Sequence, residues 1–301
     1  MRRLNWLTWL LPLSAATLIS DWPQAQLITT PNGTDYGIVV PKNRSAGVPT
    51  PALISLTGAM ADTLGCNLTN WPDPCYYANA CEFLVADHGW SCISIDLPSH
   101  GAQLEAGEPE GIAGWRWRVD RGENFVAQAN ERLRDAIDDA VRRQIIDGHA
   151  LAVAGISRGG LMAAHYAMHD ERVQAVGLLS PVTNLSLLAE FDGDASPLTR
   201  QLSLTNATNY AATLATKNIW GVIGDEDTRV YTDAFVATMR AVQCSGCAVR
   251  TSWGCSSCAA RSAQQSFRVD HEPQGHTVPP SSSGGRPTFQ ALAEWMVSVI
   301  Q

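Results

Sequence analysis

The chain has 301 residues, of which 45% are hydrophobic, so it is long enough to bury a full core. Its formal net charge is -8, and its Lys and Arg residues form no long run. This balance excludes the basic surface that nucleic-acid binding requires, so nucleic acid is not expected as a partner.

The N-terminus has the pattern of a secretory signal peptide. Arg2 and Arg3 precede an uncharged stretch that ends near position 20, and Ser14 and Ala16 form a candidate cleavage site. We therefore assign residues 1–20 to a signal peptide and expect a secreted protein, extracellular or periplasmic, with no stable membrane insertion after cleavage. The stretch is near the lower limit of the roughly 17 to 25 residues that span a bilayer, so an uncleaved N-terminal anchor is the alternative.

A β-hairpin is expected to open the folded domain. Two β-prone runs, at residues 27–30 and 36–40, flank the turn signal Pro31-Asn32-Gly33.

Short apolar runs then alternate with helical stretches. Such runs are typical of strands that are buried on both faces of a sheet. They lie at residues 52–56, 91–95, 151–156, 173–179, 219–223 and 266–269. The helical stretches lie at 76–88, 126–146, 159–169, 207–216, 232–242 and 287–300. The alternation predicts an α/β fold with a largely parallel sheet between two helical layers, and with functional residues in the loops after the strands.

The chain shows no internal repeat, no charge run and no long linker. We therefore expect residues 24–301 to form a single domain, with small insertions near 102–125, 184–204 and 244–265.

Ser157 is the candidate nucleophile, in the segment Gly155-Ile156-Ser157-Arg158-Gly159. The segment follows an apolar strand run and leads at once into a helical stretch, which is the setting of a nucleophile elbow. Only glycine fits on either side of so tight a turn, which holds the serine hydroxyl above the sheet. A glycine-rich turn without catalysis is the alternative.

A serine hydroxyl becomes a good nucleophile when a histidine accepts its proton and a carboxylate orients that histidine. Both are expected after the serine, the acid first. Three carboxylates follow the strand run at 219–223, and two histidines follow the last strand run. They are Asp225, Glu226 and Asp227, and His271 and His276.

Taken together, the GxSxG segment, the GxxDxRV pattern at 224–230 and the Gly275-His276 pair resemble the α/β-hydrolase superfamily, especially its dienelactone-hydrolase and prolyl-oligopeptidase-like branch. The resemblance extends over the chain from about residue 26. It implies the α/β-hydrolase fold with a mostly parallel eight-stranded sheet. It also implies that Asp227, which precedes x-Arg-Val, is the acid and that His276, which follows a glycine, is the base.

An oxyanion hole needs two backbone N–H groups, and the resemblance supplies candidates for both. The first donor is Arg158, directly after the nucleophile. The second is Ala59, in a segment similar to the family's LHGx loop but with Thr57 in place of His. Residues 96–101 are similar to the family's DxPxHG loop, in which we interpret His100 as structural.

Substrate contacts are expected from the insertion at 102–125, which carries Trp115, Trp117 and Arg118. An arginine there can bind a carboxylate, and a tryptophan ring can stack on a sugar. Ordinary packing of these side chains is the alternative. Met60, beside the second oxyanion donor, is the remaining predicted substrate-binding residue.

The eight cysteines fall into two groups of four, and an even count after a signal peptide predicts disulfides. They are Cys66, Cys75, Cys81 and Cys92, followed by Cys244, Cys247, Cys255 and Cys258. We expect the early group to tie the oxyanion loop to the next helix and strand. The two late CxxC pairs are too close together for a typical zinc ribbon, so disulfides are favoured and no metal is expected. Five sequons, compatible with a glycoprotein, lie at Asn32, Asn43, Asn67, Asn184 and Asn206.

The leading hypothesis is a carboxylesterase that forms an acyl-enzyme on Ser157, with His276 as base and Asp227 as acid. Its substrate is expected to be a small-molecule or polymer-derived ester, and no cofactor is implied. The alternatives are a serine peptidase of the prolyl-oligopeptidase-like type and a non-catalytic binding protein with this fold.

Overall fold

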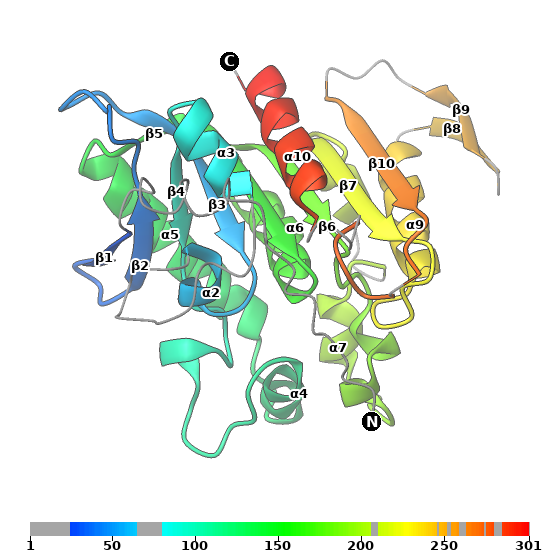
Figure 1. Ribbon diagram of the computed structural model, residues 1–301. Helices are drawn as coiled ribbons and strands as arrows, with labels where there is room; N and C mark the ends of the chain where they lie inside the picture. The colour runs from blue at the N-terminus through cyan, green and yellow to red at the C-terminus, as the bar shows by residue number, and fades with distance from the viewer. Residues whose placement is uncertain are drawn as a thin grey trace, which may run out of the picture.

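A computed structural model shows how the chain is arranged (Figure 1). It describes residues 25–64, 80–205, 210–245, 247–251, 254–258, 263–273, 275–279 and 285–300. The signal-peptide and anchor predictions for residues 1–20 lie outside these ranges, as do Cys66, Asn67, Cys75 and Asn206. Within them, no helix combines the length and the apolar character needed to cross a bilayer.

Eight strands of the described chain form one sheet, in the order β1-β2-β4-β3-β5-β6-β7-β10. They are β1 (Gln26–Thr29), β2 (Asp35–Val39), β3 (Thr50–Leu56), β4 (Ser91–Ser94), β5 (Ile146–Ile156), β6 (Val173–Leu179), β7 (Asn218–Gly224) and β10 (Gln265–Asp270). β2 pairs antiparallel with β1 and β4, and every pairing from β4 across to β10 is parallel. The predicted mostly parallel eight-stranded sheet is confirmed.

Helices cover both faces of the sheet because successive side chains of a strand point to opposite faces. In β3, Leu53 belongs to the apolar cluster that includes residues of α2 (Met60–Leu64), α3 (Ala80–Asp87) and α10 (Arg286–Val299). Its neighbour Ile54 belongs to the cluster formed with α5 (Phe125–Arg142), α6 (Arg158–His169), α8 (Tyr210–Leu214) and α9 (Thr232–Gln243). The core is therefore divided into two layers by the sheet.

Each of the three predicted insertions contains short elements. The first holds η1 (Gly101–Gln103) and α4 (Ile112–Asp120), and the second holds η2 (Leu185–Leu187), η3 (Ala189–Phe191) and α7 (Pro197–Leu202). The third holds an antiparallel hairpin of β8 (Cys247–Thr251) and β9 (Gly254–Cys258). Figure 1 shows α4 and α7 beyond the carboxyl ends of the parallel strands, the edge at which sheets of this type bind ligands.

One predicted boundary is wrong, at the junction of α5 and β5. The helix expected to reach residue 146 ends at Arg142, and the strand expected from 151 begins at Ile146. Gln144 has a φ of 57°, which ends the helix, and Ile146 pairs with Thr50 of β3. Apolar residues at 145 and 146 fit the helical spacing equally well, so strand pairing decides the boundary.

A disulfide between Cys81 and Cys92 joins α3 to β4, with a Cα–Cα distance of 5.7 Å. It provides the link between helix and strand that we expected from the early cysteines, whereas the expected tie to the oxyanion loop involves cysteines outside the described residues. Cys244 and Cys247 of the late group are also disulfide-bonded. The side chains of Cys255 and Cys258 lie outside the described part of the structure.

Removing the bond between α3 and β4 is expected to destabilise the fold. The bond closes a loop with a sequence separation of 11. By lowering the conformational entropy of the unfolded chain, a cross-link over so short a loop stabilises the folded protein by about 2 to 3 kcal/mol. The double variant Cys81→Ala/Cys92→Ala should therefore lose at least that much free energy of unfolding in a urea titration. An unfolding free energy within about 0.5 kcal/mol of the parent protein would contradict this expectation.

Candidate active site

The backbone between β5 and α6 makes a turn that admits no side chain at two positions. A Cβ added to Gly155 would lie 2.1 Å from the carbonyl oxygen of Gly159, and one added to Gly159 would lie 1.9 Å from that of Leu56. Between them, Ser157 has a φ of 55°, a strained conformation for a residue with a side chain. The predicted strand-to-helix elbow is present, and its tightness explains both glycines.

Backbone hydrogen bonds from β6 and the following loop hold the elbow in place. The Ser157 N–H donates to the carbonyl oxygen of Leu179 at 2.9 Å, and the Ser157 carbonyl accepts the N–H of Val182 at 2.9 Å. Because the main chain of Ser157 is fixed on both sides, its hydroxyl is left at the carboxyl edge of the sheet.

The structure brings Ser157, His276 and Asp227 together from three separate loops. His276 Nε2 lies 2.9 Å from Ser157 Oγ, and His276 Nδ1 lies 2.7 Å from Asp227 Oδ2. An ionised carboxylate only accepts hydrogen bonds, so Nδ1 carries the proton in this pair and the Nε2 lone pair faces the serine hydroxyl. This arrangement is able to remove the serine proton as Oγ attacks an electrophile.

Asp227 is buried, with 3% of its surface exposed, and the hydrogen bonds of its carboxylate orient it toward the histidine. Its Oδ1 accepts the backbone N–H groups of Arg229 and Val230 at 3.0 and 3.1 Å, which leaves Oδ2 for His276. The x-Arg-Val segment thus acts through its backbone, by forming a turn around the carboxylate.

Asp225 and His271, the alternatives to Asp227 and His276, form a separate, exposed pair. His271 Nδ1 is 3.1 Å from Asp225 Oδ2, and this hydrogen bond raises the pKa of His271. Asp225 Oδ1 accepts the N–H of Glu272 at 2.8 Å, and this contact, followed by that of His271, lowers the pKa of Asp225. In the described structure, neither residue is hydrogen-bonded to Ser157.

The loop after β3 carries the second predicted oxyanion donor. The Ala59 N–H has no hydrogen-bond acceptor among the described residues. Its neighbours Gly58 and Met60 are both hydrogen-bonded, to Leu97 and Asp96. Thr57, which stands in place of the family's histidine, makes a hydroxyl–hydroxyl hydrogen bond of 2.6 Å to Thr63 of α2, and its carbonyl accepts Arg158 Nε at 3.1 Å. Thr63 and Arg158 therefore support the loop where the histidine is missing, a role that the sequence did not reveal. The oxyanion roles of Ala59 and Arg158 stay predictions.

His100 is buried and packs against the oxyanion loop. Its Nδ1 donates to the carbonyl of Pro98 at 2.9 Å, and burial, followed by the charge of Arg158, lowers the pKa of His100. A Cβ on Gly58 would lie 3.0 Å from the imidazole ring and 2.7 Å from the Arg158 guanidinium. These contacts agree with a structural role for His100.

Three predicted substrate-binding residues are packed away from solvent, which corrects that expectation. Trp115 is fully buried, stacks on Phe125 with 4.6 Å between ring centroids, and donates its Nε1–H to Pro98 O. Arg118 is 5% exposed and pairs with Glu108 at 2.5 Å. Met60 is 9% exposed and lies over the backbone of Gly37.

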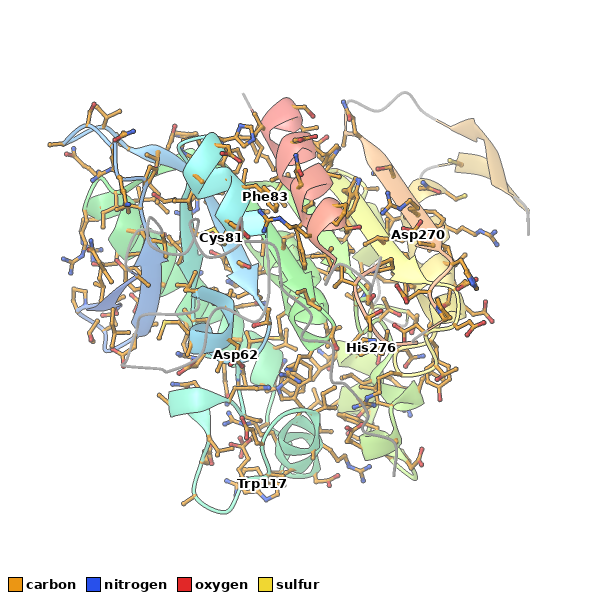
Figure 2. The ribbon with its side chains drawn as sticks, viewed as in Figure 1. Asp62, Cys81, Phe83, Trp117, Asp270 and His276 are labelled. Atoms are coloured by element: carbon orange, nitrogen blue, oxygen red, sulfur yellow. A yellow bond between two sulfur atoms is a disulfide. The ribbon has the colours of Figure 1, made fainter. Side chains whose placement is uncertain are left out.

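Trp117 is the predicted substrate-binding residue that keeps a partly exposed side chain. The guanidinium of Arg121 lies 4.1 Å from the centre of its ring. In Figure 2, Trp117 lies at the outer side of α4, away from His276. The structure therefore does not bring it together with the candidate triad.

The insertions near 102–125 and 184–204 contact each other, and the second also contacts the loop after β7 that carries Asp227, called the acid loop below. Arg229 makes two hydrogen bonds to Glu190 of η3, one of them 3.0 Å long, and Arg116 of α4 reaches the carbonyl of Asp192. The segments that overhang the carboxyl edge therefore form one connected cap.

Among the described residues, no cluster of three or more His, Cys, Asp or Glu side chains is placed to hold a metal ion.

A methyl group at the elbow is expected to disrupt it. Gly159→Ala would place a Cβ 1.9 Å from the carbonyl oxygen of Leu56, and backbone cannot yield as a flexible side chain can. We expect a loss of at least about 2 kcal/mol in unfolding free energy, measured in urea. Gly148→Ala is the matched control, because its Cβ would only touch the side chain of Val141 at 3.3 Å. Equal stability of the two variants would contradict the tight turn.

The buried Glu108–Arg118 pair predicts a pH-dependent stability. Burial raises the pKa of Glu108, but hydrogen bonds from Arg118, the Glu105 N–H and Ser99 outweigh it and hold the pKa at about 2. Because this value lies below the unfolded-state value of 4.5, the stabilisation is complete above about pH 4.5 and is lost as the pH falls toward 2. Glu108→Gln should therefore lower the unfolding free energy by about 3 kcal/mol at pH 7, and by less at pH 3.

The control for this experiment is the exposed pair of Arg116 and Asp120 on the same helix. Asp120→Asn should change the unfolding free energy by less than about 0.5 kcal/mol. A pH-independent effect of Glu108→Gln would contradict the role assigned to the buried pair.

Comparison with known proteins places this geometry in a known fold. The family model of the α/β-hydrolase fold matches residues 70–217. A search of curated protein sequences found no significant match. Among solved structures, the chain is similar to an acylaminoacyl peptidase of Pyrococcus horikoshii, with a TM-score of 0.65 and 12% identity over 97% of this chain and 44% of the peptidase.

Two further similar structures are comparable to this chain in length. An acetyl xylan esterase from Paenibacillus sp. R4 has a TM-score of 0.58 and 16% identity, with 95% of this chain and 92% of the esterase covered. A Klebsiella pneumoniae protein assigned as a candidate dienelactone hydrolase has a TM-score of 0.57 and 15% identity, over 91% and 98% of the two chains. The chain spans less than half the length of the Pyrococcus peptidase. The chain therefore has the α/β-hydrolase fold, which the family model over residues 70–217 and these solved structures share.

Proposed function

We propose that the protein is a serine hydrolase that cleaves carboxylic esters through an acyl-enzyme intermediate. The observation that carries this proposal is the unbroken hydrogen-bonded series from Ser157 Oγ through His276 to Asp227, at 2.9 and 2.7 Å. A serine in a strained elbow, a base within reach of it and a buried carboxylate behind the base are the parts that acyl transfer needs.

In the proposed reaction, Ser157 Oγ attacks the acyl carbon while His276 Nε2 accepts its proton. Asp227 stabilises the imidazolium that forms, and the negative charge on the acyl oxygen is bound by the N–H groups of Arg158 and Ala59. His276 then gives the proton to the departing alcohol, which leaves the acyl group on Ser157. Water, deprotonated by the same histidine, releases the acid and restores the hydroxyl.

An ester is favoured over a peptide for two reasons. An ester carbonyl is more electrophilic than an amide carbonyl, and an alkoxide leaves more easily than an amide anion, so ester cleavage demands less of the surrounding site. The acetyl xylan esterase also aligns over 92% of its own length, so an esterase is built from the same set of elements that this chain provides. A small-molecule or polymer-derived ester is therefore the proposed substrate class.

A peptidase is the second candidate, since the acylaminoacyl peptidase has the higher TM-score, 0.65 against 0.58 for the esterase. Fold similarity at this level of identity does not fix the substrate. The two candidates share the nucleophile and differ in the leaving group.

We also propose that the protein is exported to an oxidising compartment. The Cys81–Cys92 bond and the disulfide-bonded Cys244 and Cys247 support this, because cytosolic thiols are kept reduced.

Covalent labelling tests the catalytic assignment. A fluorophosphonate probe should label the parent protein and not Ser157→Ala, while the exposed Ser186→Ala control should be labelled like the parent. His276→Ala should lower kcat/KM for p-nitrophenyl acetate by about 10⁴-fold or more. A folded parent protein that takes up no probe and hydrolyses no ester would support the non-catalytic alternative.

A substrate panel separates the two enzymatic candidates. With p-nitrophenyl acetate, butyrate and octanoate set against N-acetylated peptide p-nitroanilides, we expect kcat/KM for the best ester to exceed that for the best amide by at least about 100-fold, or about 2.7 kcal/mol in transition-state free energy. Amide turnover equal to ester turnover would favour the peptidase.

A further inference from the structure

Asp96 belongs to the loop after β4 and faces the loop after β3, which carries Ala59, the second predicted oxyanion donor. Its Oδ1 accepts the backbone N–H of Met60 at 2.7 Å, and its Oδ2 accepts the N–H of Ala102 at 2.9 Å. Next to it, the N–H of Leu97 donates to the carbonyl of Gly58 at 2.9 Å. The loop after β4 therefore forms hydrogen bonds to Gly58 and Met60, the residues on both sides of Ala59.

The direction of the Ala59 N–H follows from the planarity of the peptide bond. Gly58 C=O and Ala59 N–H belong to one trans peptide unit, so they point in opposite directions. Because β3 lies between β4 and β5, a Gly58 carbonyl held from the β4 loop turns the Ala59 N–H toward β5, the strand that ends directly before Ser157. This is the direction in which an oxyanion donor has to point.

Asp96 fixes the next peptide unit along the loop. The Met60 N–H is bound by the carboxylate, and the carbonyl of Ala59 accepts the N–H of Asp62 at 3.1 Å and the hydroxyl of Thr63 at 3.3 Å. With both peptide units held, Ala59 has no freedom to rotate its N–H away from the site.

The surroundings of Asp96 are built to hold its carboxylate. Gly101 has a φ of 52°, and a Cβ there would lie 2.5 Å from the Asp96 carboxyl group. Arg132 Nη1 donates to the Asp96 carbonyl at 2.7 Å. Hydrogen bonds from N–H groups to an ionised acceptor are stronger than those between neutral groups, so a carboxylate holds the loop more firmly than an amide would.

We propose that Asp96 is a positioning residue for the oxyanion hole, and that its carboxylate sets the direction of the Ala59 N–H through Met60. The proposal rests on the proposed function, since an oxyanion donor has a role only in an acyl-transfer enzyme. It also assigns a purpose to the aspartate of the segment 96–101, which is otherwise remote from the triad.

The test is Asp96→Asn, in which one of the two N–H groups faces an amide nitrogen instead of an oxygen, with Asp96→Ala as the stronger change. We expect kcat for p-nitrophenyl acetate to fall by about 10- to 100-fold with KM within about threefold, less than the loss of an entire oxyanion donor. Affinity for an alkyl boronic acid, whose tetrahedral adduct places an oxygen in the oxyanion hole, should fall by the same factor as kcat/KM.

The matched control is Asp135→Asn. Asp135, like Asp96, accepts one hydrogen bond on each carboxylate oxygen, but its donors are the side chains of Thr30 and Asn32 at the β1–β2 hairpin. A role limited to stability would lower the melting temperature of both variants and leave kcat and boronate affinity unchanged. That result, in an active parent protein, would overturn the positioning role alone. A parent protein that neither hydrolyses esters nor reacts with a fluorophosphonate would instead overturn the proposed function and the positioning role together.

Discussion

At the carboxyl end of β5, the elbow folds so tightly on itself that no side chain fits at Gly155, and its close contact with the end of β3 leaves no room for one at Gly159. The rest of the site depends on this contact. It forces Ser157 into its strained conformation, starts α6 directly behind the serine, and brings the end of β3 against the elbow. Ser157, the first helical N–H groups and the loop with Ala59 are neighbours because two backbones touch.

Around this contact, two carboxylates hold neighbouring groups in place through hydrogen bonds. Asp227 binds two backbone N–H groups with one oxygen and His276 with the other, and Asp96 divides its oxygens between Met60 and Ala102. In each case a loop is wrapped around an acceptor that has a fixed place at the end of a strand. Leu97 and Val230 anchor these loops in the apolar core, and the hydrogen bonds to the two carboxylates orient the backbone N–H groups beside them.

The cap depends on a different balance of forces. Glu108 and Arg118 form a buried ion pair in the first insertion, whose Trp115 belongs to the same apolar cluster as α5. Burial of one partner alone would leave an uncompensated charge. The pair of Glu190 and Arg229 joins the cap to the acid loop, so the segments that overhang Ser157 are connected to the residues that orient His276.

Local order along the chain was sufficient for the sheet and for Ser157, whereas Asp227 and His276 were chosen among neighbouring acids and histidines by the resemblance to a known family. Alternating apolar runs determine buried strands, and a serine between two glycines at a strand end has few other uses, so these features are visible without the fold. Three things were decided by tertiary contacts. The α5–β5 boundary depends on pairing with Thr50, and the burial of Trp115 and Arg118 depends on Phe125 and Glu108. The support of the Thr57 loop by Thr63, Arg158 and Asp96 joins residues up to 101 positions apart, a separation across which sequence periodicity carries no information.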